Sequence, residues 1–239
     1  MLRLDKFLCE LNMGSRSQIK TYLKQGVVTL NGETVTKPEI KVDENKDVVT
    51  FKGELCIYRK YAYYMLNKPQ GVVSATQDNL CKSVTELLKD TGYGDLFPVG
   101  RLDKDTEGLL LMTNDGELAH DLLSPKKHVK KVYYVELEKP VTSEDILRLE
   151  EGVDIGEAKP TLPARVESIT ERSVYLTITE GKFHQVKRMM ETVGNKVTYL
   201  KRTGMGSLQL DETLQQGQYR ELTETEIDNL RQKETGIRK

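Results

Sequence analysis

The stretch GRLDKDTEGLLLMTNDG, residues 100–116, decides how this chain folds, because an acidic turn between two glycines leads directly into an apolar run. Gly100 and Gly108 allow backbone conformations or close approaches that a side chain would block. The apolar run at 109–113 is typical of a strand that is buried within a sheet. The sequence therefore predicts a turn that is anchored rigidly by a buried strand.

The carboxylate of Asp103 lies within this turn, between Arg101 and Lys104. Nearby positive charge favours the ionised form of a carboxyl group, which suits a nucleophile better than a general acid. An isolated Asp beside Gly more often caps a turn. The length of the surrounding pattern favours a catalytic interpretation of Asp103.

Residues 1–52 have the pattern of a separate small module. Apolar residues between 4 and 11 repeat at helical spacing, and Ser15 can cap a second helix that ends at Gly26. Strand-forming residues then flank Asn31-Gly32, which is a strong hairpin signal. Three basic residues recur four positions apart on one face of the second helix, where they can bind a phosphate backbone. They are Arg16, Lys20 and Lys24.

Residues 53–60 are expected to be a short linker, and residues 61–239 a second domain in which strand and helix signals alternate without a regular period. Ser83 and Glu86 form the pattern of a capping box that opens a short helix. Strands are predicted at 61–66, 129–137, 164–168, 173–179, 196–201 and 207–210, and helices at 117–123, 143–151, 184–193 and 223–232. This order predicts an α+β fold, with a mixed, mostly antiparallel sheet flanked by helices.

The composition is that of a globular protein with segregated charge. The chain has 239 residues, 37% of them hydrophobic, and a formal net charge of -1. Residues 181–206 carry six Lys or Arg against one acid, whereas residues 136–157 carry eight acids against two bases. This segregation predicts a positive face that can follow a phosphate backbone, although most charge runs are simply solvated.

Several classes of protein and site are disfavoured by the sequence. No apolar stretch is long enough to cross a bilayer, and charges occupy the start of the chain, so we expect a cytoplasmic protein without membrane association. Cys9, Cys56 and Cys81 show no Cys-x-x-Cys pairing and are expected to be reduced. The three histidines are not spaced as metal ligands, and no glycine-rich nucleotide loop is present. We therefore expect neither a metal nor a cofactor.

Five blocks of sequence, in the expected order over nearly the whole chain, resemble the rRNA pseudouridine synthases. The first is residues 100–110, and the others are YMLNKPQG at 64–71, KVYYV at 131–135, EGKFHQVKRM at 180–189 and the amino-terminal module. The match is strongest to the small-subunit ribosomal pseudouridine synthase A group. The amino-terminal module is similar to the RNA-binding module first known in ribosomal protein S-four. The resemblance implies an S-four-like module followed by a curved synthase sheet with a cleft across its middle.

The resemblance also implies roles for individual residues. Asp103 is expected to be the essential nucleophile, and Tyr133 the aromatic residue that stacks on a flipped-out uracil and can take part in proton transfer. Lys187 is the first choice for the cation that holds Asp103 ionised. Arg188 is expected to contact phosphate or to form a structural pair.

Two more residues near this site are assigned to RNA binding. His184 is expected to be either a core histidine or a contact to RNA, without a proton-transfer role. Arg101 is expected to aid binding or to brace the catalytic loop.

These features predict a monomeric, cofactor-independent enzyme that isomerises one uridine of small-subunit ribosomal RNA. One alternative is a large-subunit rRNA pseudouridine synthase, although such relatives tend to have Arg where this chain has His184. Another is a non-catalytic RNA-binding factor in ribosome assembly that has kept the fold. A methyltransferase would need a glycine-rich nucleotide loop, which the sequence lacks.

Overall fold

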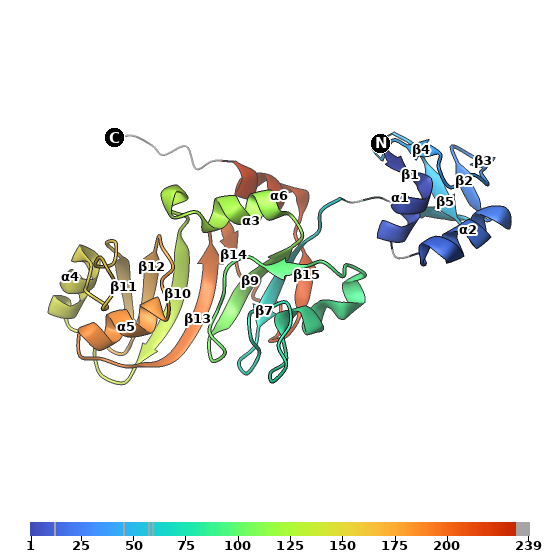
Figure 1. Ribbon diagram of the computed structural model, residues 1–239. Helices are drawn as coiled ribbons and strands as arrows, with labels where there is room; N and C mark the ends of the chain where they lie inside the picture. Colours follow the sequence, from blue (N-terminus) through green and yellow to red (C-terminus); the bar gives the residue numbers. More distant parts are fainter. Residues whose placement is uncertain (12, 45, 57, 59, 233–239) are drawn as a thin grey trace. The chain divides into compact units, whose positions relative to one another are not determined.

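The computed structural model describes residues 1–11, 13–44, 46–56, 58 and 60–232. The chain forms two compact units (Figure 1). One unit consists of Met1–Lys60 with Lys89–Gly94, and the other of Tyr61–Leu88 with Asp95–Lys239. Each unit has its own apolar core, so the two are described separately.

The first unit combines two helices with short strands. Its helices are α1 (Leu4–Glu10) and α2 (Arg16–Lys24). Its strands are β1 (Leu2–Arg3), β2 (Val28–Leu30), β3 (Glu33–Thr34), β4 (Lys41–Val42), β5 (Val49–Phe51) and β6 (Glu54–Cys56). Ser15 caps α2 in a reciprocal capping box with Gln18, as its position before the helix predicts. Apolar residues of both helices and of strands β2, β4, β5 and β6 form the core.

Two tight turns shape the four-stranded sheet, whose order is β3-β2-β5-β6. Asn31 and Gly32, with φ of 53° and 87°, join β2 to β3 as the sequence predicts. Lys52 and Gly53, with φ of 52° and 85°, join β5 to β6 in the same way. The expected linker over 53–60 is therefore wrong for Glu54–Cys56, because this hairpin carries the chain back into the sheet.

The second unit is built on a nine-stranded sheet with the order β11-β12-β10-β13-β9-β7-β15, to which β14 adds beside β13 and β8 beside β9. The strands are β7 (Tyr63–Lys68), β8 (Phe97–Pro98), β9 (Glu107–Thr113), β10 (Lys131–Leu137), β11 (Arg165–Thr170), β12 (Ser173–Ile178), β13 (Val197–Met205), β14 (Leu208–Gln209) and β15 (Tyr219–Glu221). The β9–β13 pair is parallel, and the other described pairs of this sheet are antiparallel. The predicted mixed, mostly antiparallel sheet is confirmed.

Strand β9 lies near the middle of this sheet, and all seven of its residues are buried. Gly108 has φ of 100° and lies against the backbone of β13, where an added Cβ would come 2.2 Å from the carbonyl oxygen of Arg202. Glycine is therefore required at this position so that the parallel pair can close. The predicted buried strand is confirmed, and Gly108 joins the acidic turn to it.

Helices flank the sheet as predicted. They are α3 (Gly116–Leu123), α4 (Ser143–Glu151), α5 (Gln185–Thr192) and α6 (Glu224–Arg231), with 3₁₀ segments η1 (Val84–Thr91) and η2 (Pro125–Lys127). Figure 1 shows α4 and α5 beside the end of the sheet that holds β10, β11 and β12. Helices α3 and α6 contribute to one apolar cluster with β7, β9, β13 and β14. The short helix predicted after Ser83 forms as the 3₁₀ segment η1.

The predictions differ from the structure mainly at strand ends and in short strands. Strand β13 continues to Met205, four residues beyond its predicted end, and β7 is shifted toward Lys68. Strand β15 was not predicted, although it pairs with β7 at the edge of the sheet. Short strands of this kind are stabilised by their neighbours more than by their own sequence.

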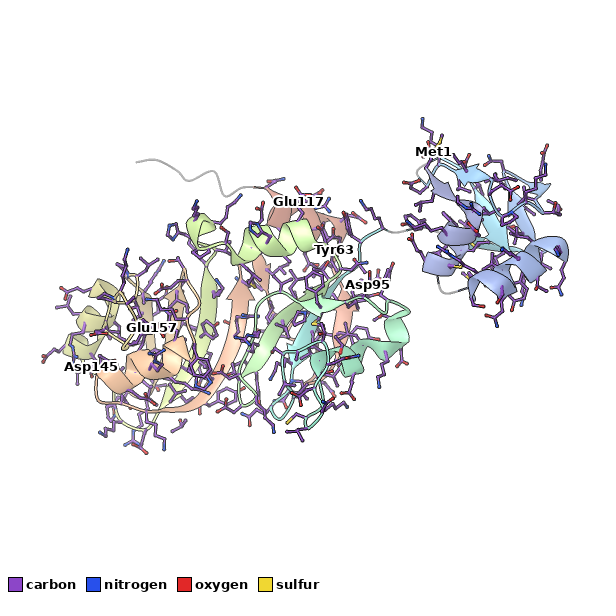
Figure 2. All side chains as sticks on the ribbon, in the orientation of Figure 1. Met1, Tyr63, Asp95, Glu117, Asp145 and Glu157 are labelled. Carbon is purple, nitrogen blue, oxygen red and sulfur yellow. The ribbon has the colours of Figure 1, made fainter. Side chains whose placement is uncertain are left out.

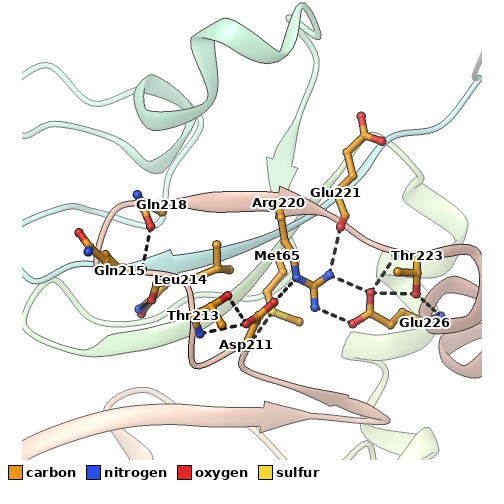
Figure 3. Close-up of polar contacts among 11 residues, drawn as sticks. Met65, Asp211, Thr213, Leu214, Gln215, Gln218, Arg220, Glu221, Thr223 and Glu226 are labelled. Carbon is orange, nitrogen blue, oxygen red and sulfur yellow. Dashed lines mark hydrogen bonds and ion pairs between the residues drawn. The ribbon is translucent and has the colours of Figure 1, made fainter.

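A network of ion pairs holds the β15 edge and helix α6 together (Figure 3). Arg220 Nε lies 2.6 Å from Asp211 Oδ2, and the two terminal nitrogens of Arg220 donate to Glu226 at 2.8 and 2.9 Å. Hydrogen bonds from Thr213 and from Arg220 lower the pKa of Asp211 to about 2. The contact with Arg220 lowers the pKa of Glu226 to about 2 as well. The contacts of Arg220 thus join β15 to the residues before and after it.

Helix α6 has a second anchor on the same unit. The hydroxyl of Tyr63, labelled in Figure 2, donates to Asp115 Oδ2 at 2.6 Å, and Arg231 donates to that hydroxyl. Burial, together with the bond to Asp115, raises the pKa of Tyr63. These contacts connect β7, the start of α3 and the end of α6.

Candidate active site

A cavity of about 770 Å³ opens on one face of the sheet of the second unit. Its walls are the loop that precedes β9, the strands β10 and β13, and the segment from the end of β12 into α5. Asp103, Tyr133 and Lys187 all line it. Residues separated by more than 80 positions in the chain therefore meet around one space.

Asp103 forms an ion pair inside this cavity. Lys187 Nζ lies 3.1 Å from Asp103 Oδ2 and 2.6 Å from Asp105 Oδ1, so that one ammonium group binds two carboxylates of the same loop. The hydrogen bond from Lys187 lowers the pKa of Asp105. Burial lowers the pKa of Lys187, but its bonds to Asp105 and Asp103 outweigh burial and raise that pKa overall. Lys187 is therefore held charged beside Asp103.

The Asp103 loop is braced from below by Lys68, at the end of β7. The Lys68 side chain is fully buried, and its Nζ donates to the carbonyl oxygens of Asp103 at 3.0 Å and Thr106 at 2.8 Å. Burial lowers the pKa of Lys68 to about 8. Ser74 adds reciprocal hydrogen bonds to the backbone of Leu102. These contacts fix the backbone that presents the Asp103 carboxylate.

Tyr133 and Tyr134 face opposite sides of β10, as the alternation of a strand requires. Tyr133 is buried and lines the cavity. Tyr134 instead makes edge contacts with the rings of Tyr175 and Tyr199, at centroid distances of 5.8 and 6.1 Å. The sequence interpretation that one of the two tyrosines lines the pocket agrees with this geometry.

His184 occupies the position before α5 with a left-handed backbone, φ 48°. Its Nε2 lies 3.6 Å from Asp103 Oδ1, and its ring stacks on Phe183 with centroids 3.9 Å apart. Phe183 is 67% exposed and also lines the cavity. His184 is thus at the wall of the site and is not a core histidine.

Comparisons with known proteins agree with this geometry. Residues 62–192 match the family described as RNA pseudouridylate synthase, and residues 2–48 match the S4 domain. An uncharacterized RNA pseudouridine synthase of Bacillus subtilis (strain 168) is 50% identical over 231 residues, which cover 95% of this chain and 97% of that protein. The chain belongs to the RNA pseudouridine synthase family. It is an isomerase that acts on RNA and carries an RNA-binding S4 domain.

Further relatives extend the match along the whole synthase. The ribosomal small subunit pseudouridine synthase A of Haemophilus influenzae is 41% identical over 232 residues, covering 96% of this chain and 99% of that one. The protein of the same name from Escherichia coli (strain K12) is 41% identical over 227 residues, covering 95% and 98%. A crystal structure of a pseudouridylate synthase aligns with a TM-score of 0.69 at 41% identity, covering 96% of this chain and all of that one.

The synthase does not bring Arg188 into the cavity. Arg188 donates to Glu157 Oε1 at 2.7 Å, to the carbonyl oxygen of Phe183 at 3.0 Å and to that of Ile155. Glu157 is labelled in Figure 2. Of the two roles that the sequence left open for Arg188, these contacts favour structural pairing.

Arg101 and the basic residues of α2 are exposed to solvent. Arg101 is exposed and lines the cavity mouth beside Asp103. Arg16, Lys20 and Lys24 are exposed on α2, whose buried residues are Ile19 and Leu23. The predicted basic face of that helix therefore exists.

Sequence reasoning missed the burial of the site's cations, among them Lys68 and Arg202. Lys68 belongs to the block YMLNKPQG, and Arg202 to the basic run after residue 181, but neither pattern shows that a charged side chain is buried. Both lie on strands whose other residues are mostly apolar or half-buried. A lysine or arginine within an otherwise apolar strand is the signal that could have identified them.

The described residues contain no cluster of three or more His, Cys, Asp or Glu side chains suited to a metal ion. Within the same part of the chain, no helix is both long and apolar enough to cross a membrane. Cys9 and Cys81 are partly buried and Cys56 is buried, and all three are free thiols.

Proposed function

We propose that this synthase converts a uridine of small-subunit ribosomal RNA to pseudouridine, with Asp103 as the nucleophile. The observation that carries the proposal is the ion pair between Asp103 and Lys187 in the cavity that Tyr133 also lines. The ribosomal substrate is supported by the relatives named ribosomal small subunit pseudouridine synthase A. Ribosomal RNA as substrate implies that the reaction takes place in the cytoplasm.

The reaction needs no external donor, because it rearranges the bonds of one nucleotide. The bond between ribose C1′ and uracil N1 breaks, and its electron pair leaves with the ring. The ring turns so that C5 bonds to C1′, C5 loses its proton, and N1 gains one. A carboxylate held beside a cation can act as the nucleophile in this sequence, whether it attacks the ribose or the base.

The target uridine must leave the RNA stack to reach Asp103, because the carboxylate lies in a cavity. Base flipping costs a few kcal/mol, and stacking on an aromatic ring offsets part of that cost. Tyr133 is the aromatic side chain that we assign to this contact. Its hydroxyl can also take part in the proton transfer between C5 and N1.

The remaining groups are assigned to positioning and RNA binding. Lys187 orients the Asp103 carboxylate through their ion pair, and Arg101 and His184 contact RNA at the cavity wall. Arg16, Lys20 and Lys24 on α2 of the S4 domain bind the phosphate backbone. Because the residues assigned to catalysis all belong to one chain, we propose that the synthase acts as a monomer.

The proposal is tested by Asp103→Asn, with Asp105→Asn as the matched control in the same loop. Purified protein is incubated with small-subunit rRNA, and pseudouridine is mapped chemically. We expect Asp103→Asn to abolish product while RNA binding persists, and Asp105→Asn to keep most of the activity. Activity that survives in Asp103→Asn would exclude it as the nucleophile.

The ribosomal target is tested by mapping pseudouridine in both rRNAs from cells that lack the protein. Loss of one small-subunit modification is the expected result. A loss confined to large-subunit rRNA would assign the synthase to that RNA. If no modification changes and the purified protein only binds rRNA, a non-catalytic role in assembly replaces the proposal.

A further inference from the structure

Arg202, on β13, is a buried arginine on the floor of the cavity. Its side chain is 1% exposed, and it is among the residues that line the cavity. Its Nε donates to the carbonyl oxygen of Leu109 at 2.8 Å. One of its terminal nitrogens is buried without any hydrogen-bond partner in the described chain.

An arginine in this situation is costly to the folded protein. A guanidinium group stays charged in proteins and carries five N–H donors, so burial without an acceptor loses both hydration and hydrogen bonds. A buried charge is normally paired. Among the residues that the structure describes, Arg202 has no carboxylate partner. Its position therefore suits a ligand that supplies an acceptor.

The cation next to Arg202 makes the site more positive. Lys131 is buried at the start of β10, lines the same cavity, and donates to the carbonyl oxygen of Val129. Burial, and after it the charge of Arg202, lowers the pKa of Lys131 to about 8. Two neighbouring cations at the bottom of one cavity favour a ligand that is anionic or becomes so.

The position of Arg202 determines which part of the RNA substrate can contact it. In the β10–β13 register Arg202 is directly opposite Tyr133, so both side chains are on the same face of the sheet. The phosphates of a flipped nucleotide remain connected to the RNA on both sides and stay at the cavity mouth. Because Arg202 is 1% exposed and lines the cavity, only a group that enters the cavity, such as the flipped base, can come near it.

We propose that the guanidinium of Arg202 binds a carbonyl oxygen of the target uracil and stabilises the negative charge that develops on the ring. This inference rests on the proposed function. If C1′ is attacked, the electron pair of the C1′–N1 bond leaves with the ring and spreads onto O2 and O4. If C6 is attacked, the electrons of the C5–C6 double bond move toward O4. In both routes negative charge develops on a carbonyl oxygen, to which the Arg202 guanidinium is placed to donate a hydrogen bond.

The first test compares Arg202→Met with Lys201→Met. Lys201 is the neighbouring residue on β13 and faces the other side of the sheet, so it serves as a matched loss of charge. Single-turnover pseudouridine formation and RNA affinity are measured for both variants, with thermal melting as the check on folding. We expect Arg202→Met to lower the rate by about 100-fold or more, with RNA affinity within about twofold of the wild type.

Two outcomes of this test would overturn the inference. An unchanged rate in folded Arg202→Met would show that the guanidinium is not used in the reaction. A weaker RNA affinity, with the slope of log Kd against log salt reduced by about one, would identify Arg202 as a phosphate contact instead. Failure of the proposed function would look different, because the wild-type protein itself would then form no pseudouridine.

A second test uses the substrate and does not require the Met variant to fold. RNA with 2-thiouridine or 4-thiouridine at the target position replaces one carbonyl oxygen by the weaker acceptor sulfur. The rates of wild-type protein and of Arg202→Lys are compared on both RNAs. We expect one sulfur substitution to slow the wild type at least about tenfold, and to have a smaller effect on Arg202→Lys. Equal sensitivity of the two proteins to both substitutions would overturn the inference.

Discussion

Two arginines of the synthase unit, Arg220 and Arg202, differ in how their charge is compensated. Arg220 binds two carboxylates, and the pKa values of Asp211 and Glu226 are both lowered to about 2. Arg202 is more deeply buried and has one hydrogen bond, from its Nε, within the described part of the chain. A fully paired arginine stabilises the fold, whereas an unpaired one in a cavity is available to a ligand. The same residue type thus marks structure in one place and function in the other.

Among the cations of the cavity, Lys187 on α5 is the one whose substitution should reduce catalysis most. Lys187→Met removes the ammonium group shared by Asp103 and Asp105, and we expect the rate of pseudouridine formation to fall by about 100- to 1,000-fold. The melting temperature should change little, because Lys187 is partly exposed. Rate and melting are measured on the same preparation. A large loss of stability with a normal rate would place Lys187 with Arg220 as a structural cation.

The backbone that carries Arg202 can be disturbed without touching its side chain. Gly108→Ala places a Cβ 2.2 Å from the Arg202 carbonyl oxygen, in a backbone conformation that disfavours alanine. We expect a loss of about 3 kcal/mol or more in the free energy of unfolding, measured by denaturant titration. Gly116→Ala, which meets nothing within 4 Å, is the control and should be nearly neutral. Comparable stability of the two variants would mean that β9 and β13 can separate at low cost.

Substitution of Arg220 should lower the stability and leave the reaction rate unchanged, which is the reverse of the effect expected for Arg202. Arg220→Met leaves Asp211 and Glu226 without their cation, and we expect a loss of about 2 kcal/mol in the free energy of unfolding, because the pairs are partly exposed. The rate of the folded variant should equal that of the wild type. The comparison between the two arginines fails if Arg220→Met is slow at temperatures where it is fully folded.

Low pH should weaken the ion pairs that Arg220 forms with its carboxylate partners. The pKa of Glu226 is lowered in the folded chain. The ion pair between Glu226 and Arg220 therefore contributes fully to the free energy of unfolding above the ordinary carboxyl pKa, and this contribution is lost as the pH falls toward about 2. From pH 5 to pH 3 we expect this contribution to decrease by about 1 kcal/mol, after allowance for solvent screening. Urea unfolding at several pH values measures the slope. The free energy of unfolding of Arg220→Met should depend less steeply on pH than that of the wild type. An identical slope would mean that other carboxylates dominate the pH dependence of stability.

Much of the fold could be predicted from short patterns. The helix at 143–151, the capped helix after Ser15 and the hairpin at Asn31-Gly32 depend on residues within a few positions of one another. Hydrogen bonds and φ preferences over that range are local, so the sequence records them directly. The hairpin at Lys52-Gly53 was missed because lysine is an uncommon first residue in such a turn.

The sequence predicted the main residues of the candidate site and left the roles of other residues open. The blocks that contain Asp103, Tyr133 and Lys187 are recognisable, and the structure places all three around one cavity. The periodicity of a helix shows that Lys187 and Arg188 point in different directions. It does not show which neighbours each will meet. Arg188 meets Glu157, about thirty residues earlier in the chain.

The sequence by itself determined the family, the S4 domain and synthase order, and the carboxylate in its glycine-bounded turn. The tertiary structure decided which cations are paired and which are buried without a partner. The reason is that the burial of Lys68 and Arg202 depends on strands β7, β9 and β13 becoming neighbours in one sheet. Charge compensation between distant segments is a property of packing, and no local pattern contains it.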